Sequence, residues 1–168
     1  MEVSSKILVR ESGHRVHPHL HRHGLVVDVE VTEASGNAER EAALRLLDRH
    51  PSRDRRTLAA DKAYDTKQFV ADCCERGVTP HVAMNISGTR HSAIDTRTTR
   101  HDGYRVSQRI RKRVEECFGW GKDGRPLRKM KVYGKRKVAF LTTLTVGIYT
   151  LLRVAKLLGP PQPVPAQP

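Results

Sequence analysis

Apolar and polar residues alternate in short stretches through the first half of the chain, which predicts strands separated by helices. Residues 25–31 begin apolar and end in strict alternation, as a half-buried strand does. Residues 38–50 place Ala42 and Leu46 on one stripe at helical spacing, with acids in the first turn. These two stretches predict a strand followed by a helix.

The next three elements continue this order: a strand at residues 57–60, a helix at residues 66–76 and a strand at residues 78–83. Gly77 supplies the stop signal of the helix. Pro80 lacks a backbone N–H and therefore limits the third strand to a sheet edge. A strand–helix–strand–helix–strand order predicts an α/β fold with a mixed sheet, flanking helices and a right-handed crossover.

The first 23 residues predict little regular structure. Residues 3–9 alternate weakly and favour a short edge strand, while residues 11–23 are polar and rich in histidine. The histidines are His14, His17, His19, His21 and His23. We interpret them as part of a solvated basic loop. A zinc or nickel site is the alternative, although no cysteine or carboxylate stands among them to complete it.

The second half of the chain predicts a polar loop and two helices. Residues 85–104 show no periodicity, and residues 106–118 gather apolar side chains on one side of a helix. In the last apolar stretch, residues 138–152, helical spacing predicts a buried helix. Its stripe comprises Leu141, Leu144, Ile148, Leu151 and Ala155. Residues 159–168 contain five prolines and predict a disordered tail.

The charge balance narrows the class of partner. Lys and Arg number 31 against 18 Asp and Glu, a net charge of +13. Such an excess is typical of proteins that bind polyanions, because each neutralised phosphate releases counterions. We expect no membrane partner, since the longest apolar stretch is interrupted by threonines. Three cysteines without metal-type spacing, and no signal sequence, favour reduced thiols in the cytoplasm.

Two carboxylates are candidates for chemistry. Asp61 ends a short apolar strand, where a carboxylate at the sheet's carboxyl edge can hold Mg²⁺. Glu115 lies at the border of the apolar side of its helix, with Arg111 and Lys122 within an arc of roughly 40°. The alternatives are a helix-capping role for Asp61 and a surface ion pair of Glu115 with Arg111, worth about 0.3–0.5 kcal/mol.

Cations surround Glu115 in a discontinuous band. We predict that they contact DNA phosphates, although a solvated surface is the usual role of such runs. The candidate DNA-binding residues are Arg109, Arg111, Lys112, Arg113, Lys122, Arg125, Arg128 and Lys129.

These residues resemble bacterial insertion-sequence transposases of the DDE class, in the branch with the helical motif Tyr-x2-Arg-x3-Glu-x6-Lys. Arg111, Glu115 and Lys122 match its last three positions, while Gln108 replaces the tyrosine. Asp61, in the segment Ala-Ala-Asp-Lys-Ala-Tyr-Asp, is similar to the family's second acid. The likeness runs from about residue 24 to residue 158.

The resemblance implies a ribonuclease-H-like fold in which three acids bind two Mg²⁺ ions. Asp61 and Glu115 would then be catalytic and metal-binding. DNA would be the partner, as terminal repeats and target, and a homo-oligomer is compatible with the family. The first acid has no counterpart before residue 25. We therefore expect a catalytic region at residues 24–158 that lacks its first central strand, preceded by an irregular segment at residues 1–23.

Such a domain would be a truncated transposase that requires another chain for activity. The alternative is a non-catalytic basic DNA-binding remnant that inhibits the full-length enzyme. Zinc or nickel binding by the histidine tract is the third hypothesis.

Overall fold

A computed structural model describes residues 2–4, 7–9, 14–86, 91–123, 127 and 130–159. The strands are β1 (Glu2–Ser4), β2 (Ile7–Val9), β3 (His14–His21), β4 (Val26–Glu33), β5 (Arg56–Ala60) and β6 (Val78–Val82). The helices are α1 (Ala38–Arg49), the 3-10 helix η1 (Lys62–Tyr64), α2 (Lys67–Glu75), α3 (Thr96–Thr99), α4 (Asp102–Arg111), α5 (Arg113–Lys122) and α6 (Lys135–Leu158).

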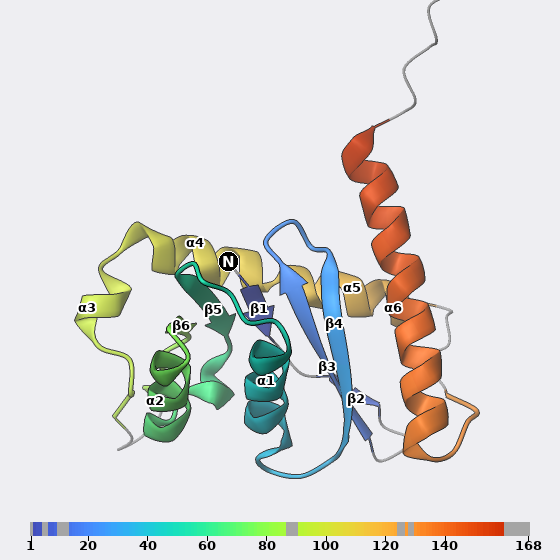
Figure 1. Ribbon diagram of the computed structural model, residues 1–168, viewed down its shortest axis with the longest axis horizontal. Coiled ribbons are helices and arrows are strands. Elements are labelled where there is room, and N and C mark those ends of the chain that lie inside the picture. Colours follow the sequence, from blue (N-terminus) through green and yellow to red (C-terminus); the bar gives the residue numbers. More distant parts are fainter. Residues whose placement is uncertain are drawn as a thin grey trace, which may run out of the picture.

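One mixed sheet organises the molecule (Figure 1). β3 pairs antiparallel with β4 along its length, and with β1 and β2 at its two ends. β1 and β6 each pair with β5 in parallel. The prediction of a mixed α/β fold is confirmed, and β6 with Pro80 lies at the sheet's end as expected.

The prediction that the sheet lacks a central strand is wrong for the position between β3 and β5. β1 occupies it, antiparallel to β3 and parallel to β5. The segment predicted as an edge strand thus divides into β1, inside the sheet, and β2. Three residues are too few to show the apolar run by which a central strand is recognised in a sequence.

The histidine-rich stretch also departs from the prediction of a solvated loop. His14–His21 forms β3, in which His17 and His19 are buried. They lie two residues apart and therefore share one face of the strand. Pro18 falls between the stretch of β3 paired with β1 and the stretch paired with β2, where a missing N–H is tolerated. Imidazoles buried in hydrogen-bonded surroundings explain how so polar a sequence forms an interior strand.

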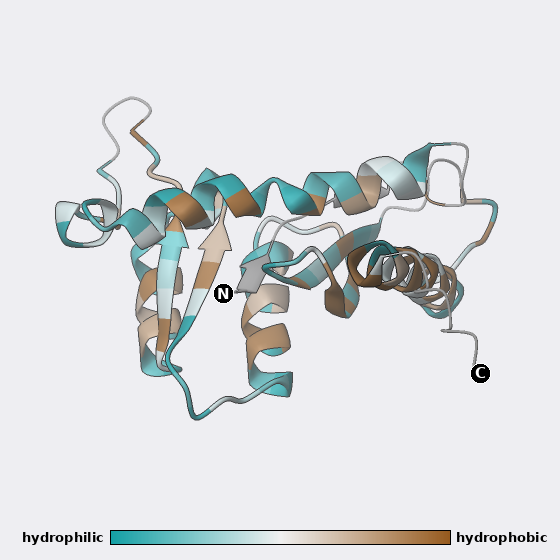
Figure 2. Ribbon diagram, turned by 90° about the horizontal axis from the view of Figure 1, so that it is seen from above, coloured by the Kyte–Doolittle hydropathy of each residue, from teal (hydrophilic) through white to brown (hydrophobic). Residues whose placement is uncertain are grey.

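Helices cover both faces of the sheet (Figure 2). α1 packs on β3 and β4 and α2 on β6, on one face, while α4 and α6 pack on the other. The apolar cluster on the α1–α2 side includes Leu58, Phe69 and Val82. The opposite cluster includes Leu20, Val114 and Phe118. The two clusters bury both faces of the mixed sheet.

Local sequence signals explain the helices that were predicted well. Thr66 caps α2, its hydroxyl accepting from the backbone N–H of Phe69. Gly77 follows α2 with φ of 67°, a conformation that favours glycine. The helix predicted at residues 106–118 is two helices, α4 and α5, which meet at Lys112.

The apolar stripe predicted for α6 does not face the core as expected. Leu144, Ile148 and Leu151 are exposed, whereas the buried positions include Thr142 and Thr145. The helix is thus packed through its more polar side. By length and composition α6 could cross a membrane, contrary to the sequence-based expectation, but one helix of this kind is weak evidence for a span.

Candidate functional site

Asp61 stands directly after β5, at the carboxyl edge of the parallel β5–β6 pair. Its backbone is extended, and its Oδ1 accepts from the backbone N–H of Ala63 at 2.8 Å, which begins η1. Asp61 therefore caps η1, as the alternative interpretation of this residue predicted. It occupies one carboxylate oxygen and leaves Oδ2 without a hydrogen-bond partner among the described residues.

Arg111, the last residue of α4, lines the same pocket as Asp61. The pocket measures about 460 Å³ and is also lined by Lys62, Ala83 and Met84. α4 reaches this position because it packs across β1, β5 and β6. The Nε of Arg111 is buried without a hydrogen-bond partner in the described part of the chain. The structure thus brings together two predicted site residues that are fifty positions apart.

Glu115 does not line that pocket. It is exposed in the first turn of α5, on the other side of the interruption at Lys112 from Arg111. Within the described residues no ion pair joins it to Arg111, so the surface-pair alternative is not observed in this structure. Glu115 is therefore accessible to solvent.

The predicted DNA-binding residues differ in their surroundings. Arg109, Lys112 and Lys122 are exposed. Arg113 donates through Nη1 to the backbone carbonyl of Arg22 and so ties α5 to the end of β3. Three further candidates, Arg125, Arg128 and Lys129, lie outside the described residues.

Asp65 has a structural role that the sequence did not reveal. It is buried, and its two carboxylate oxygens accept from the backbone N–H groups of Asn85 and Ala93, at 2.6 and 2.8 Å. This carboxylate fixes the segment after β6 beside the Asp61 pocket. A buried acid that bonds two distant amides leaves no spacing signal in a sequence.

Gln108, at the position of the motif tyrosine, bonds backbone instead of projecting freely. Its Nε2 donates to the carbonyl of His81 at 2.5 Å, and the His81 Nδ1 lies 2.7 Å from the hydroxyl of Ser107. Burial lowers the pKa of His81 below its ordinary value. Burial also raises the pKa of Tyr104, whose hydroxyl donates to Val82. Uncharged groups therefore hold α4 on β6.

The donor set near Asp61 is small for a metal centre. Across the described residues no three His, Cys, Asp or Glu side chains lie close enough together to hold a metal ion. The histidine hypothesis therefore gains no support from β3. Asp61 fits a Mg²⁺ ion that takes one or two carboxylates and completes its shell with phosphate and water. Two ions would require more carboxylates than this pocket offers.

Residues 13–151, most of the chain, match the family described as the transposase DDE domain. The chain belongs to this DDE transposase family. Membership implies the ribonuclease-H-like fold that the sequence motifs suggested. Family members generally use a divalent metal.

No curated protein matches the sequence. Among solved structures, one similar chain belongs to the simian T-cell lymphotropic virus intasome in complex with PP2A regulatory subunit B56 gamma. The identity is 10% and the TM-score 0.49. The match covers 99% of this DDE transposase chain and 59% of the viral one.

Proposed function

We propose that this chain is part of an insertion-sequence transposase of bacterial type, which cuts and joins DNA phosphodiesters with Mg²⁺. The observation that carries this proposal is the pocket shared by Asp61 and Arg111. It combines a carboxylate at a parallel sheet edge with a buried, unpaired guanidinium nitrogen in a chain of net charge +13. A phosphate group would satisfy the guanidinium and complete the shell of a metal on the carboxylate.

Asp61 and Glu115 are the proposed metal-binding acids. Bound Mg²⁺ would polarise the scissile phosphodiester and favour loss of a proton from the attacking hydroxyl or water. Arg111 would neutralise phosphate charge beside it. Arg109, Lys112 and Lys122 would contact flanking phosphates of the terminal repeat and the target DNA.

The first acid of the triad is the element we propose to be missing. β1 runs beside β5, with Val3 opposite Ala59. Among the residues of β1 and β2, Glu2 is the only acid, and it lies opposite Leu58, three residues before Asp61. We therefore propose that catalysis needs a carboxylate from elsewhere, such as a second chain.

Mg²⁺-dependent cleavage and strand joining of terminal-repeat DNA, alone and with an intact transposase of the same element, tests this proposal. Asp61→Asn and Glu115→Gln should each abolish the activity of the mixture that depends on this chain. The matched control is Glu116→Gln, an exposed neighbour of Glu115 that lies outside the motif. Activity that survives both acid substitutions would exclude these two residues as the catalytic acids.

A non-catalytic DNA-binding role is the second candidate. The small donor set around Asp61 favours it. In that case DNA retention would fall with salt and would be unchanged by Asp61→Asn and Glu115→Gln. Added to an intact transposase, the chain would reduce strand joining.

A further inference from the structure

Two arginines from the second half of the chain meet at the turn between β3 and β4. Arg113 of α5 donates through Nη1 to the backbone carbonyl of Arg22. Arg153 of α6 donates through Nε to the next carbonyl, that of His23, at 3.1 Å. Because the two acceptors are neighbours in the chain, the two guanidinium groups lie at one place on the surface.

Gly24 is the residue of the turn that both side chains contact. It follows the two carbonyls with φ of 80°, a conformation that favours glycine. A Cβ at this position would lie 3.5 Å from the Nε of Arg153 and 3.8 Å from the Cδ of Arg113. The two arginines therefore pack on the same side of the turn.

The turn gathers positive charge without a paired acid. Arg22 is exposed at its tip and adds a third guanidinium group. Glu116, like Arg113 and Arg153, lies within electrostatic range of Tyr149. Among the described residues, however, no ion pair joins Glu116 to either arginine. Like charges gathered in this way repel one another, and a bound anion would offset the repulsion.

Each arginine keeps donors for a ligand. A guanidinium group has five N–H donors, and within the described residues the bonds to the turn use one from Arg113 and one from Arg153. The remaining donors form a planar fork that matches the oxygens of a phosphate. The turn carbonyls already hold both side chains in place, which reduces the entropy lost when a ligand binds.

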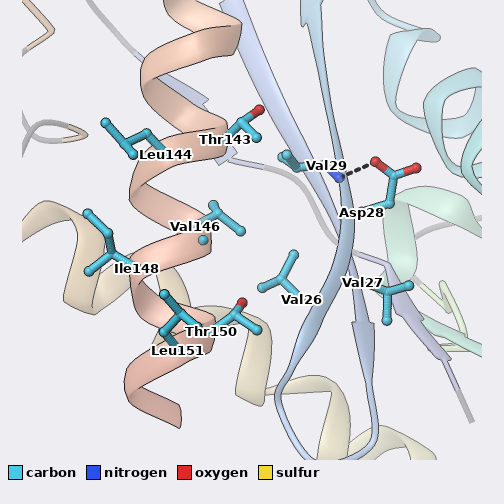
Figure 3. Close-up of a pocket in the computed structure, with 11 residues that line it drawn as sticks. Val26, Val27, Asp28, Val29, Thr143, Leu144, Val146, Ile148, Thr150 and Leu151 are labelled. Carbon is cyan, nitrogen blue, oxygen red and sulfur yellow. Dashed lines mark hydrogen bonds between the residues drawn. The ribbon is translucent and has the colours of Figure 1, made fainter. Parts of the chain in front are cut away.

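The groove next to the turn does not offer a rival site for an anion. It measures about 570 Å³ and separates β4 from α6, with Val26, Val29 and Leu151 among its walls (Figure 3). None of the residues that line it is cationic. An anion at the turn would therefore stay at the outer rim, where Arg153 reaches from α6 to the turn.

The position of Arg113 on the motif helices indicates a polyanion as the ligand. α4 and α5 follow one another across the sheet toward α6 (Figure 1, Figure 2). Arg111 ends α4 in the pocket of Asp61. Lys112 is exposed at the interruption, and Arg113 begins α5. A row of cations from the pocket to the turn fits a chain of phosphates better than a single small anion.

We propose that Arg113 and Arg153 bind the phosphodiester backbone of DNA at the β3–β4 turn, with Arg22 beside them. DNA held at the Asp61 pocket would then follow α4 and α5 and reach α6. The identity of the ligand rests on the proposed function, whereas the site itself does not depend on the metal chemistry at Asp61.

The salt dependence of DNA binding counts phosphate contacts and tests the site. Arg113→Gln and Arg153→Gln remove the charge but keep an amide that can donate to the turn. For a fluorescein-labelled duplex in Mg²⁺-free buffer, each should reduce the slope of log association constant against log salt by about 0.9. Arg53→Gln is the matched control, because it removes an exposed arginine from the turn before β5. Unchanged slopes for the two site variants, an equal loss in the control, or a wild-type chain that does not bind DNA would overturn the proposal.

Lysine variants separate phosphate binding from a purely structural role. Arg113→Lys and Arg153→Lys keep the charge, so they should keep the wild-type slope although the planar fork is lost. If the arginines only held α5 and α6 on the turn, the glutamine variants would lower the unfolding temperature and leave the slope unchanged. That result would contradict the proposal.

A cross-link locates the DNA directly. In a Cys74→Ser background, which removes an exposed thiol, His23→Cys carrying an azidophenacyl group should cross-link to the duplex on irradiation. Ser52→Cys, exposed in the turn before β5, should not. Equal cross-linking from both positions would show diffuse binding. Displacement of the duplex by inorganic phosphate at constant ionic strength would assign the arginines to a small anion. Either result would exclude the proposed site.

The proposed function and this site can fail separately. DNA cleavage with unchanged salt slopes would support the function and exclude the site. Reduced slopes and a cross-link at the turn, without the Mg²⁺-dependent activity described above, would support the site and exclude the chemistry.

Discussion

The β5–β6 half and the β3–β4 half of the sheet are covered on the same face by helices, but with opposite chemistry. Around β5 and β6 the buried side chains are apolar and include Leu58, Phe69 and Val82. Between α1 and the β3–β4 pair the buried side chains include polar ones: His17 bonds Thr32, and His19 contacts the ring of His50 edge-on.

Ion pairs complete the polar half. Arg15 pairs with Glu39, and Arg45 and Arg49 pair with Glu30. The difference shows that one helical layer can be held either by transfer of apolar groups from water or by matched polar partners. The stability gained from apolar burial depends on how well the side chains fill the core volume. The stability gained from polar contacts depends on each buried polar group having its partner.

Phe69→Ala should give the largest effect, because it removes a fully buried ring from the apolar half. We expect a loss of about 3–5 kcal/mol in the free energy of unfolding, measured by urea denaturation. Phe140→Ala, on an exposed ring, should change the monomer little. Equal losses for the two variants would show that burial does not distinguish these sites.

Thr32→Val should lower the free energy of unfolding by less than Phe69→Ala does. Threonine and valine have similar volumes, so the expected loss comes from the hydroxyl group. The Thr32 hydroxyl lies 2.8 Å from the Nε2 of His17, and the substitution leaves that buried nitrogen without this partner. A loss of about 1–3 kcal/mol in the free energy of unfolding is expected. Thr143→Val on the exposed side of α6 serves as the comparison, and a neutral Thr32→Val would indicate that this half is held by packing.

His81→Gln should have the smallest effect, seen as a change in pH dependence. Burial lowers the pKa of His81 in the fold, so the unfolded chain binds the proton more readily. Its contribution to stability is therefore present above the unfolded pKa of 6.5 and is lost as pH falls below that value. Wild type and variant unfolding curves at several pH values should show a shallower acid loss for His81→Gln. Parallel curves would show that titration of His81 does not contribute to the loss of stability in acid.

The β5–β6 half was easier to predict from the sequence than the β3–β4 half, because its signals are local. Thr66, Gly77 and Pro80 act locally, so α2 and β6 were predicted close to their observed bounds. β3 was missed because a histidine reports nothing about burial until its partner is known, and Thr32 lies on another strand. The stripe of α6 was identified, but helical spacing does not say which side faces the core.

The candidate site shows the same limit. Asp61 was predicted at the end of β5, and its pocket with Arg111 brings together the strand and the motif helix. Asp65 was not predicted as the residue that anchors the segment after β6. The roles of Asp61 and Glu115 in metal binding stay predictions, since they depend on a ligand that only a complex with DNA would supply.

The interruption at Lys112 places the motif residues Arg111 and Glu115 on two different helices. α4 carries Arg111 and rests on the sheet beside Asp61, whereas α5 carries Glu115 and is joined to α6 by the Trp120–Tyr149 ring contact at 5.7 Å. A displacement of α6 would therefore act first on the helix that carries Glu115. By thermodynamic reciprocity, a contact on α6 that sets the position of α5 would change the affinity for a metal held by both acids, and that metal would change the affinity of the contact by the same factor.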